Sequence, residues 1–525
     1  MGKIKFNEYL KEIKSNYLRN FKVNVFFSVI IILIFFAALF VRVYRLDDLL
    51  GFYYDQGRDA LVIWKFIHEG KPFLIGPVTG LHGIFLGPLF YYLITPLYLI
   101  GNGNPVYPAV FLAASSAISV LVVYFLGVNM HSKTAGVVAA TLSGFSFYII
   151  YNSRWFSNPN PMLLLSTLFL SSLWLLISTK KSIWVVWSTF LAGISLQFES
   201  ASAVFYLPIL ALILVRHYEI YNMKTVGKLI KNKDEIKLIL LSAILFVATL
   251  LPQLIFNFRH ENILINNFIN LFFKEKAFRP LTVNILAIKI DYFWSTFTNK
   301  IYPGVFIHRM LFIATPIAAL VVMRSNLKRN LILLFTIFFG VPILGITFFQ
   351  GNFGNIYDYY LIGYFIPFVL LISIGLAEFS RTWIGKTFLI LFLVSFLINN
   401  INPMQSILKN SMDGPTDIKL ESQVQAVDWI ISDAVGRGKF NLHIYVPPVI
   451  PYSYDYLYVW RANNLCGGNL CGKVDAEVPL IYTLYEQDPP HPERLVKWLQ
   501  DQENIGKNVQ QMKFGGITVE RRERI

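Results

Sequence analysis

The sequence has little cysteine and little charge for its length. Only two of its 525 residues are cysteines, Cys466 and Cys471, and both lie near the C-terminal end. Disulfides therefore cannot organise the fold, although one local bridge is possible if that segment lies in an oxidising compartment. Charged residues make up only 15% of the chain, against 55% hydrophobic residues. One globular core cannot bury this much apolar surface, so the composition predicts a membrane protein.

Two other features are also missing. The first hydrophobic run, residues 24–40, is too long for a secretory signal, and no small-residue cleavage pattern follows it before Arg42 and Arg45. We therefore expect the run to remain as a membrane anchor. The net charge of +15 is not gathered into a basic helix interleaved with aromatic residues, so it does not indicate nucleic-acid binding. Short basic clusters between apolar runs indicate the positive-inside rule of membrane topology instead.

About eleven apolar stretches have the roughly 17 to 22 residues that cross a bilayer. They begin near residues 24, 106, 134, 161, 183, 201, 237, 310, 330, 357 and 386. A twelfth stretch, residues 87–100, is shorter and contains Pro88 and Pro96. If the twelfth does not cross, the basic clusters all fall on one side, which is then the cytoplasm. Those clusters lie in residues 3–22, 131–133, 180–181, 216–237, 324–329 and 381–386. We therefore predict that residues 87–100 form a re-entrant or interfacial helix packed against protein.

This topology predicts a multi-pass protein of the plasma membrane with a cytoplasmic N-terminus. The segment after residue 402 would lie outside, where the hydropathy falls and the pattern changes. Residues 417–434 and 492–502 have helical periodicity, and residues 440–446 and 478–484 resemble strands. We therefore divide the chain into a transmembrane domain, residues 1–401, and a small external α/β domain, residues 402–525, of ordinary domain size.

Polar residues of catalytic type gather in the predicted external loops. The first loop opens with Tyr53-Tyr54-Asp55-Gln56-Gly57-Arg58-Asp59 directly after a span, and an amphipathic stretch then leads towards His82. Three later segments have similar character. They are residues 151–161 with Arg154 and Asn158, residues 252–260 with Arg259, and Tyr357-Asp358-Tyr359-Tyr360.

At these segments, in this order, the sequence resembles the GT-C glycosyltransferases, which use polyprenyl-phosphate sugars. This group includes the protein O-mannosyltransferases, the lipid A aminoarabinose transferases and the oligosaccharyltransferase catalytic subunits. The resemblance covers most of the first 400 residues and none of the C-terminal segment. It implies a helical GT-C membrane fold with interfacial helices in the first external loop. It also implies a lipid-linked sugar donor, inversion at the anomeric carbon, and a glycan, lipid or protein acceptor.

The chemistry of such a transfer requires these residue types independently. An acceptor hydroxyl or amine needs a base beside the anomeric carbon, and Asp55 is the candidate. An ordinary aspartate has a pKa of about 4, which makes it a weak base at neutral pH. A low-dielectric interface would raise this pKa and make the carboxylate a stronger base. The leaving phosphate departs without protonation if cations stabilise it. Arg58, Arg154 and Arg259 are the candidates for that role.

These residues also have structural interpretations. Asp55 would be an ordinary solvated loop acid like Asp47 or Asp48, and Arg259, at the end of an apolar run, would mark the membrane interface. Asp59 shares a helix face with Asp55 and would simply pair with Arg58. Arg154 would anchor the membrane interface beside Trp155.

The remaining candidates line the expected cavity less specifically. Glu199 ends a span, where a buried acid would be costly, and would either line the acceptor cavity or lie just outside the hydrocarbon. His82 is an ordinary loop histidine or a cavity residue. Asp358 and Tyr359 match a family segment that contacts the donor, and otherwise belong to an aromatic belt.

A divalent cation is a weak expectation. Many family members carry an acid in the second external loop where this sequence has Asn158 and Asn160. Amide ligands alone hold a divalent cation poorly, so we predict no metal ligands here.

We therefore expect a transferase that takes a sugar from a polyprenyl-phosphate donor among the membrane lipids. The main alternative is a transporter or flippase of lipid-linked sugars. Such proteins place charges within spans, often in repeated halves, whereas the charges here gather at span ends and no repeat is visible. A ligase that transfers whole glycans would use a similar cavity.

Overall fold

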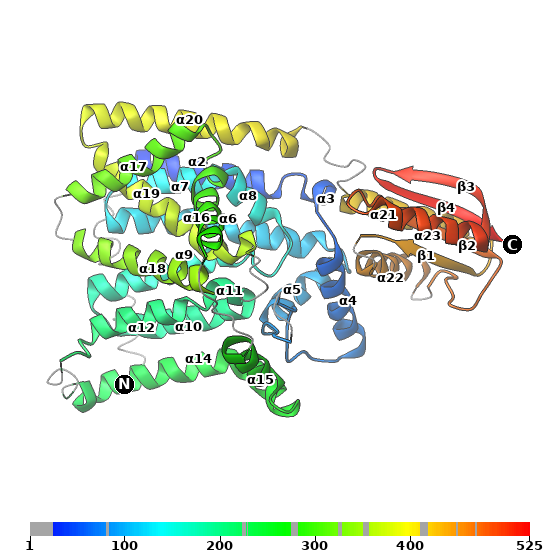
Figure 1. Cartoon of the computed structure of the whole chain (residues 1–525), viewed down its shortest axis with the longest axis horizontal. Helices are drawn as coiled ribbons and strands as arrows, with labels where there is room; N and C mark the ends of the chain where they lie inside the picture. The colour runs from blue at the N-terminus through cyan, green and yellow to red at the C-terminus, as the bar shows by residue number, and fades with distance from the viewer. Residues whose placement is uncertain are drawn as a thin grey trace.

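The structure is a computed structural model of the chain, and most of it is helical (Figure 1). It describes residues 25–79, 83–222, 227, 229–274, 282–323, 328–349, 356–409, 418–447, 450–467 and 470–525. A bundle of long helices makes up most of the molecule, and a small domain with a β-sheet lies at one end of it.

Within the described residues, eight helical segments are long and apolar enough to cross a membrane. They are α2 (Val25–Val43), α6 (Val106–Met130), α9 (Met162–Thr179), α11 (Ser200–Ala203) with α12 (Tyr206–His217), α14 (Lys233–Arg259), α18 (Lys328–Phe348), η4 (Asp358–Tyr364) with α19 (Phe365–Phe379), and α20 (Trp383–Leu408). A ninth is the bent pair α7 (Lys133–Phe145) and α8 (Phe147–Arg154). The protein is therefore a multi-pass membrane protein.

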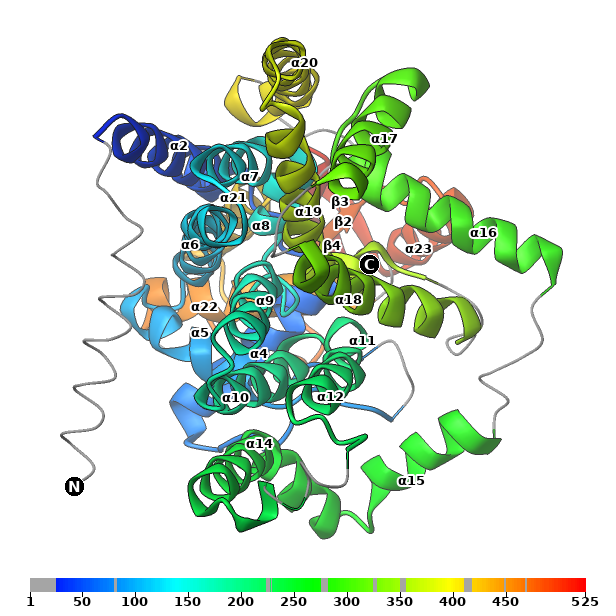
Figure 2. The same ribbon diagram turned by 90° about the vertical axis from the view of Figure 1, so that its left-hand side faces the viewer.

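Shorter apolar helices lie at the other two positions where spans are predicted. They are α10 (Ile183–Phe198) and α17 (Phe306–Val322). The twelfth stretch forms α5 (Leu89–Ile100), whose 12 residues rise only roughly 18 Å, against about 30 Å of bilayer core. Its length therefore agrees with the predicted re-entrant or interfacial helix. The bundle is organised around α9, which packs against α6, α10, α12, α18 and α19 and lies near the centre of the bundle in Figure 2.

The loop after α2 and the segment after α14 supply further helices beside the bundle. They are α3 (Leu46–Leu49), α4 (Tyr54–Glu69), α15 (Ile263–Ile269), η1 (Asn270–Lys274), α16 (Val283–Trp294) and η2 (Ser295–Lys300). Helix α4 begins where the Gln56 side-chain oxygen accepts a hydrogen bond from the Tyr53 backbone, at 3.0 Å. It ends at Gly70, whose φ of 67° is left-handed and favours glycine. The sequence thus defines both ends of the helix that carries Asp55.

Two arginines hold the bend between α7 and α8, where the helix axis turns by 57°. The Arg42 guanidinium on α2 is fully buried and donates hydrogen bonds to the carbonyls of Ser143 and Gly144, which precede the bend. In return, Arg154 at the end of α8 donates to the carbonyls of Arg42 and Tyr44 at the end of α2. Each arginine therefore satisfies backbone oxygens that a helix end leaves without partners.

The C-terminal domain contains a four-stranded sheet in the order β1-β2-β4-β3. Strand β1 (Phe440–Tyr445) pairs in parallel with β2 (Leu480–Glu486), while β4 (Ile517–Arg524) lies antiparallel to both β2 and β3 (Gly506–Phe514). The helices of this domain are α21 (Leu420–Ala434), α22 (Tyr452–Cys466) and α23 (Pro492–Ile505). Cys466 and Cys471 form a disulfide. The predicted fold class, a polytopic helical protein with a small C-terminal α/β domain, is confirmed.

Candidate active site

The first turn of α4 carries three charged side chains in mutual contact. The Arg58 guanidinium lies 2.8 Å from the Asp55 carboxylate and 2.8 Å from the Asp59 carboxylate, so one cation bridges two acids. The side chain of Asp55 is 66% exposed, whereas that of Asp59 is buried. The Tyr91 hydroxyl of α5 also donates to Asp59, at 2.8 Å. Asp59 is therefore the fixed member of the group, and Asp55 is the acid that a substrate can reach.

Burial and charge act in opposite directions on these groups. Burial raises the pKa of Asp59 to about 6, against the lowering effects of Arg58 and of its hydrogen bonds. Burial alone would lower the pKa of Arg58, but the carboxylates of Asp59 and Asp55 raise it above its ordinary value. Arg58 thus remains a cation throughout the physiological pH range, while Asp59 changes its charge near pH 6.

Asp55 and Arg58 line a large cavity of about 830 Å³ between α4, the bundle and the segment around α16. Part of its wall is polar and part is apolar. The apolar part comprises Leu196, Val204, Phe205, Leu250, Phe268, Ile346 and Phe349. A cavity of this size and mixed character suits a ligand with a polar head and a hydrocarbon tail.

Polar side chains from the ends of α8 and α10 form another side of the cavity. Glu199 is buried, and its carboxylate accepts a hydrogen bond from the Ala201 backbone at 2.9 Å. Asn158 donates from its amide to the Phe198 carbonyl at 2.6 Å. Asn160 donates to backbone carbonyls of its own loop, and its side-chain oxygen is buried without a hydrogen-bond partner. All three residues line the cavity.

The third side of the cavity contains η4 and Lys289, a lysine that the sequence did not single out. Asp358 and Tyr359 both line the cavity, and Asp358 forms an ion pair with Lys300. Lys289 of α16 is almost fully buried, lines the cavity and donates to the Phe349 carbonyl at 3.3 Å. The cavity therefore has a second cation in addition to Arg58. Tyr360, next to Tyr359 in the chain, is a further lining residue that the sequence left unassigned.

The cavity therefore gathers most of the predicted site residues but not all. Asp55, Arg58, Asn158, Glu199, Asp358 and Tyr359 all line it. Arg154 is not among the lining residues, because its guanidinium is occupied by the carbonyls at the end of α2. Arg259 is exposed at the end of α14 and is likewise not a lining residue. His82 lies outside the described residues.

Metal ligands are scarce in the part of the chain that the structure describes. No group of three or more His, Cys, Asp or Glu side chains gathers there in a way that could hold a metal ion. Beside the amides of Asn158 and Asn160 the cavity wall has one carboxylate, that of Glu199, and the accessible acid Asp55 is paired with Arg58. These donors fit a hard divalent cation poorly.

The fold itself is similar to a solved membrane enzyme. A scan of protein-family models and a search of curated proteins give no match to the sequence. Among solved structures, ArnT from Cupriavidus metallidurans bound to undecaprenyl phosphate has a TM-score of 0.55 at 10% identity, over 95% of this chain and 97% of ArnT. The apo state of the same protein has a TM-score of 0.57 at 10% identity, over the same shares.

A weaker likeness exists to the archaeal oligosaccharyltransferase AglB from Archaeoglobus fulgidus, with a TM-score of 0.48, 10% identity, and coverage of 87% of this chain and 69% of AglB. ArnT is a lipid A aminoarabinose transferase of the GT-C superfamily, and the likeness to ArnT extends over nearly the whole of both chains. The chain therefore has the GT-C fold of membrane glycosyltransferases.

Proposed function

We propose that the protein is an inverting glycosyltransferase that moves a sugar from a polyprenyl-phosphate donor to an acceptor at the external face of the membrane. One observation carries the proposal: a single large cavity combines an accessible acid, Asp55, with two cations, Arg58 and Lys289, and an apolar wall. The GT-C fold supports it, since ArnT, which has this fold, has been solved bound to undecaprenyl phosphate.

The walls of the cavity match the two parts of such a donor. The apolar side chains from α10, the turn between α11 and α12, α14 and the end of α18 suit an isoprenoid chain. Arg58 and Lys289 supply positive charge for the phosphate. Glu199, Tyr359 and Tyr360 supply hydrogen-bonding groups for sugar hydroxyls.

In the proposed step, an acceptor hydroxyl oxygen attacks the anomeric carbon of the donor sugar. The bond between that carbon and the phosphate oxygen breaks, and its electron pair stays on the phosphate. Asp55 takes the proton of the hydroxyl as a general base. Arg58 and Lys289 stabilise the charge that develops on the leaving phosphate. The products are a glycoside of inverted configuration and the free polyprenyl phosphate.

We further propose that the N-terminus is cytoplasmic and that the C-terminal domain is external. Helices α14, α18 and α20 begin near basic clusters, and all three begin at the end of the bundle away from the sheet (Figure 1). The positive-inside rule makes that end cytoplasmic. A disulfide between Cys466 and Cys471 is typical of an oxidising external compartment.

The test is transfer of radiolabelled sugar from membrane-extracted polyprenyl-phosphate donors by the purified protein. We expect Asp55→Asn to abolish transfer while keeping the protein folded, because the amide has the same shape but cannot accept the proton. The matched control is Asp47→Asn, which changes an exposed acid in the segment between α2 and α4. This variant should stay active. Full activity of Asp55→Asn would refute the mechanism. Protein-dependent movement of the donor across a vesicle bilayer without turnover would indicate a transporter instead.

The same assay tests the metal-free form of the reaction. Because the described part of the cavity has no cluster of metal-ligating side chains, we expect transfer to survive extensive treatment with EDTA. Loss of activity on chelation, restored by adding back one divalent cation, would contradict this expectation.

A further inference from the structure

The C-terminal domain contacts the helix that carries Asp55 at unusually short range. Helix α22 packs against α4, and backbone lies against backbone at Gly57, between Asp55 and Arg58. A Cβ atom built on Gly57 would lie 2.3 Å from the backbone nitrogen of Ser453 and 2.4 Å from its Cα. Backbone atoms cannot rotate away from such a clash. Glycine at position 57 therefore allows α22 to approach α4 backbone to backbone at the turn that carries the proposed base.

Hydrogen bonds also join α22 to a second element of the membrane domain, the turn between α5 and α6. The Tyr456 hydroxyl donates to the Gly103 carbonyl, and the Trp460 indole donates to the Asn102 carbonyl at 2.8 Å. Both acceptors lie in the turn between α5 and α6. Their donors are almost fully buried, so each hydrogen bond forms away from water, where its loss leaves an unpaired polar group. Helix α22 is thus attached to two elements of the membrane domain, α4 and the α5–α6 turn.

The chain just before α4 is attached to the C-terminal domain as well. The Tyr53 hydroxyl donates to the Ile418 carbonyl at 3.0 Å, and the Leu420 backbone donates to the Leu50 carbonyl at 2.9 Å. The residues that lead into the first turn of α4 are therefore held by the C-terminal domain on both sides of Phe52, which is fully buried.

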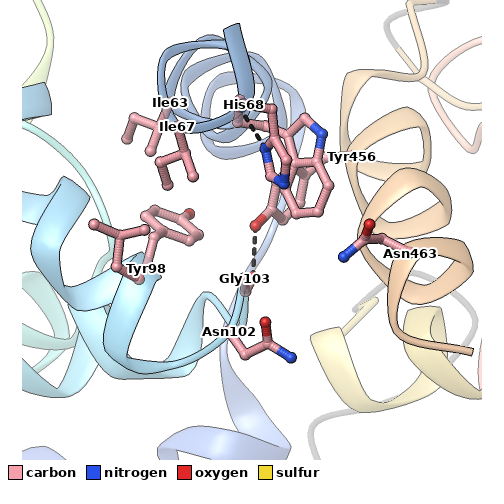
Figure 3. Close-up of a pocket in the computed structure, with 10 residues that line it drawn as sticks. Ile63, Ile67, His68, Tyr98, Asn102, Gly103, Tyr456 and Asn463 are labelled. Carbon is pink, nitrogen blue, oxygen red and sulfur yellow. Dashed lines mark hydrogen bonds between the residues drawn. The ribbon is translucent and has the colours of Figure 1, made fainter. Parts of the chain in front are cut away.

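Packing between α22 and the membrane domain is not continuous, so these individual contacts matter. A small pocket of about 70 Å³ remains between α4, α5 and α22, lined by residues that include Trp64, His68 and Asn463. Figure 3 shows Tyr98 and Tyr456 reaching towards it from opposite sides, with the Tyr456 hydroxyl bonded to Gly103. The pocket has room for about two water molecules. The position of α22 therefore depends on the contact at Gly57, on the two hydrogen bonds from Tyr456 and Trp460, and on a third that the Asn102 amide donates to the Asn464 side chain at 3.1 Å.

We propose that the C-terminal domain is a positioning element of the active site: through Gly57, Tyr456 and Trp460, helix α22 fixes the first turn of α4 and so directs Asp55 into the cavity. The inference rests on the proposed function, in which Asp55 is the base. Asp55 is mostly exposed, and its ion pair is made within the same turn of α4, so its direction follows the backbone of α4. A base must lie within hydrogen-bond reach of the proton that it removes.

The test compares two sets of conservative variants on α22. The double variant Tyr456→Phe, Trp460→Phe removes the two hydrogen bonds that α22 donates to backbone carbonyls of the α5–α6 turn and keeps aromatic rings in place. The hydrogen bond that the Asn102 amide donates to Asn464 remains. The control is Tyr458→Phe on the same helix, which removes a buried hydroxyl that donates to Leu470 within the C-terminal domain. We expect the double variant to lower kcat by about tenfold or more, since misplacement of a catalytic group by about 1 Å has effects of up to about a hundredfold. The KM for the donor should change less than kcat, because Arg58 moves with α4 whereas the apolar wall and Lys289 belong to other elements.

Hydrogen exchange, read by mass spectrometry, gives a second measurement that needs no substrate. The double variant should increase exchange in the first turn of α4 and leave α9 unchanged, whereas Tyr458→Phe should change neither. Gly57→Ala should give the same exchange pattern and a larger loss of kcat. Its control is Gly340→Ala, because the corresponding Cβ at Gly340 has open space around it.

Three results would overturn the proposal. They are unchanged exchange in α4, equal kcat losses in the double variant and in Tyr458→Phe, or a loss explained entirely by a smaller folded fraction. If wild-type protein shows no transfer at all, the proposed function fails, but the exchange measurement still decides whether α22 fixes the first turn of α4.

Discussion

At the scale of single residues, the cations of the cavity show what sequence patterns can and cannot locate. Arg58 was predicted because it follows Asp55 in a polar run at a span end, and it lines the cavity. Lys289 was not predicted, because its neighbours Ile288 and Ile290 are apolar and give the segment the character of a buried helix. Arg154 occurs in an equally polar run, but backbone carbonyls occupy its guanidinium. Local composition therefore does not distinguish an arginine that faces a cavity from one that caps a helix.

Lys289 gives the first prediction at this scale. We expect Lys289→Gln to raise the donor KM by about ten- to 150-fold, because a charge-assisted hydrogen bond contributes roughly 1.5–3 kcal/mol. Lys289→Arg should retain part of the affinity, and Lys237→Gln, an exposed lysine of α14, should behave like wild type. Steady-state kinetics over a range of donor concentrations provides the measurement. An unchanged KM in Lys289→Gln would exclude Lys289 from the phosphate site.

Asp59 gives a prediction about pH. Its pKa is raised to about 6 by burial, so it is ionised at pH 7 and takes up a proton as the pH falls through 6. When Asp59 is protonated, Asp55 is the one charged carboxylate that Arg58 contacts in α4. The ion pair between Arg58 and Asp55 is then stronger, and Asp55 is less available as a base. Transfer should therefore fall on the acid side, with an apparent pKa of about 6.

The control is Asp59→Asn, which imitates the protonated form. Its activity should be low and nearly constant between pH 5 and 7, because the titrating group has been removed. An acid limb at the same pH in this variant would show that a different group titrates.

At the scale of elements, periodicity predicted the apolar helices well and the C-terminal domain only partly. Helices α21 and α23 and strands β1 and β2 lie where the pattern indicated them. Helix α22 was missed, because its sequence, Tyr452-Ser453-Tyr454-Asp455-Tyr456, alternates aromatic and polar residues as strands do. Strand β4 was missed because it contains Glu520 and Arg522, which are buried as an ion pair at 2.5 Å. In both cases tertiary packing outweighs local preference.

The boundary between the domains, after residue 401, is a prediction from the fall in hydropathy. Helix α20 itself continues to Leu408. Hydropathy marks where the apolar character ends, and a helix can extend beyond that point into the next domain.

The bend between α7 and α8 gives a prediction at this scale. Arg42→Leu leaves the carbonyls of Ser143 and Gly144 without their donor inside the bundle. Each buried group left unpaired costs about 1–3 kcal/mol, so we expect a clear fall in the melting temperature of the detergent-solubilised protein. Arg381→Leu is the control, because this arginine is mostly exposed and Glu378, its ion-pair partner, keeps its contact with His131 when Arg381 is replaced. Equal melting temperatures for the two variants would show that Arg42 does not stabilise the bend.

At the scale of the whole molecule, the basic clusters predict which end of the bundle is cytoplasmic. Several of these clusters lie wholly or partly outside the described residues, including residues 3–22 and 324–327. The orientation therefore follows from charge counted along the chain, together with the helix ends that the structure does describe.

This orientation can be measured directly, because both native cysteines are joined in a disulfide. A single introduced cysteine is then the one free thiol in the described part of the chain. Lys497→Cys places it on α23 of the C-terminal domain, and Lys386→Cys places it near the start of α20; both lysines are exposed. With a membrane-impermeant maleimide, intact cells should label Lys497→Cys at once and Lys386→Cys only after lysis. The reverse pattern would invert the topology. It would also place the opening of the cavity, and with it Asp55, on the cytoplasmic side, so that the donor and acceptor would have to be sought among cytoplasmic molecules.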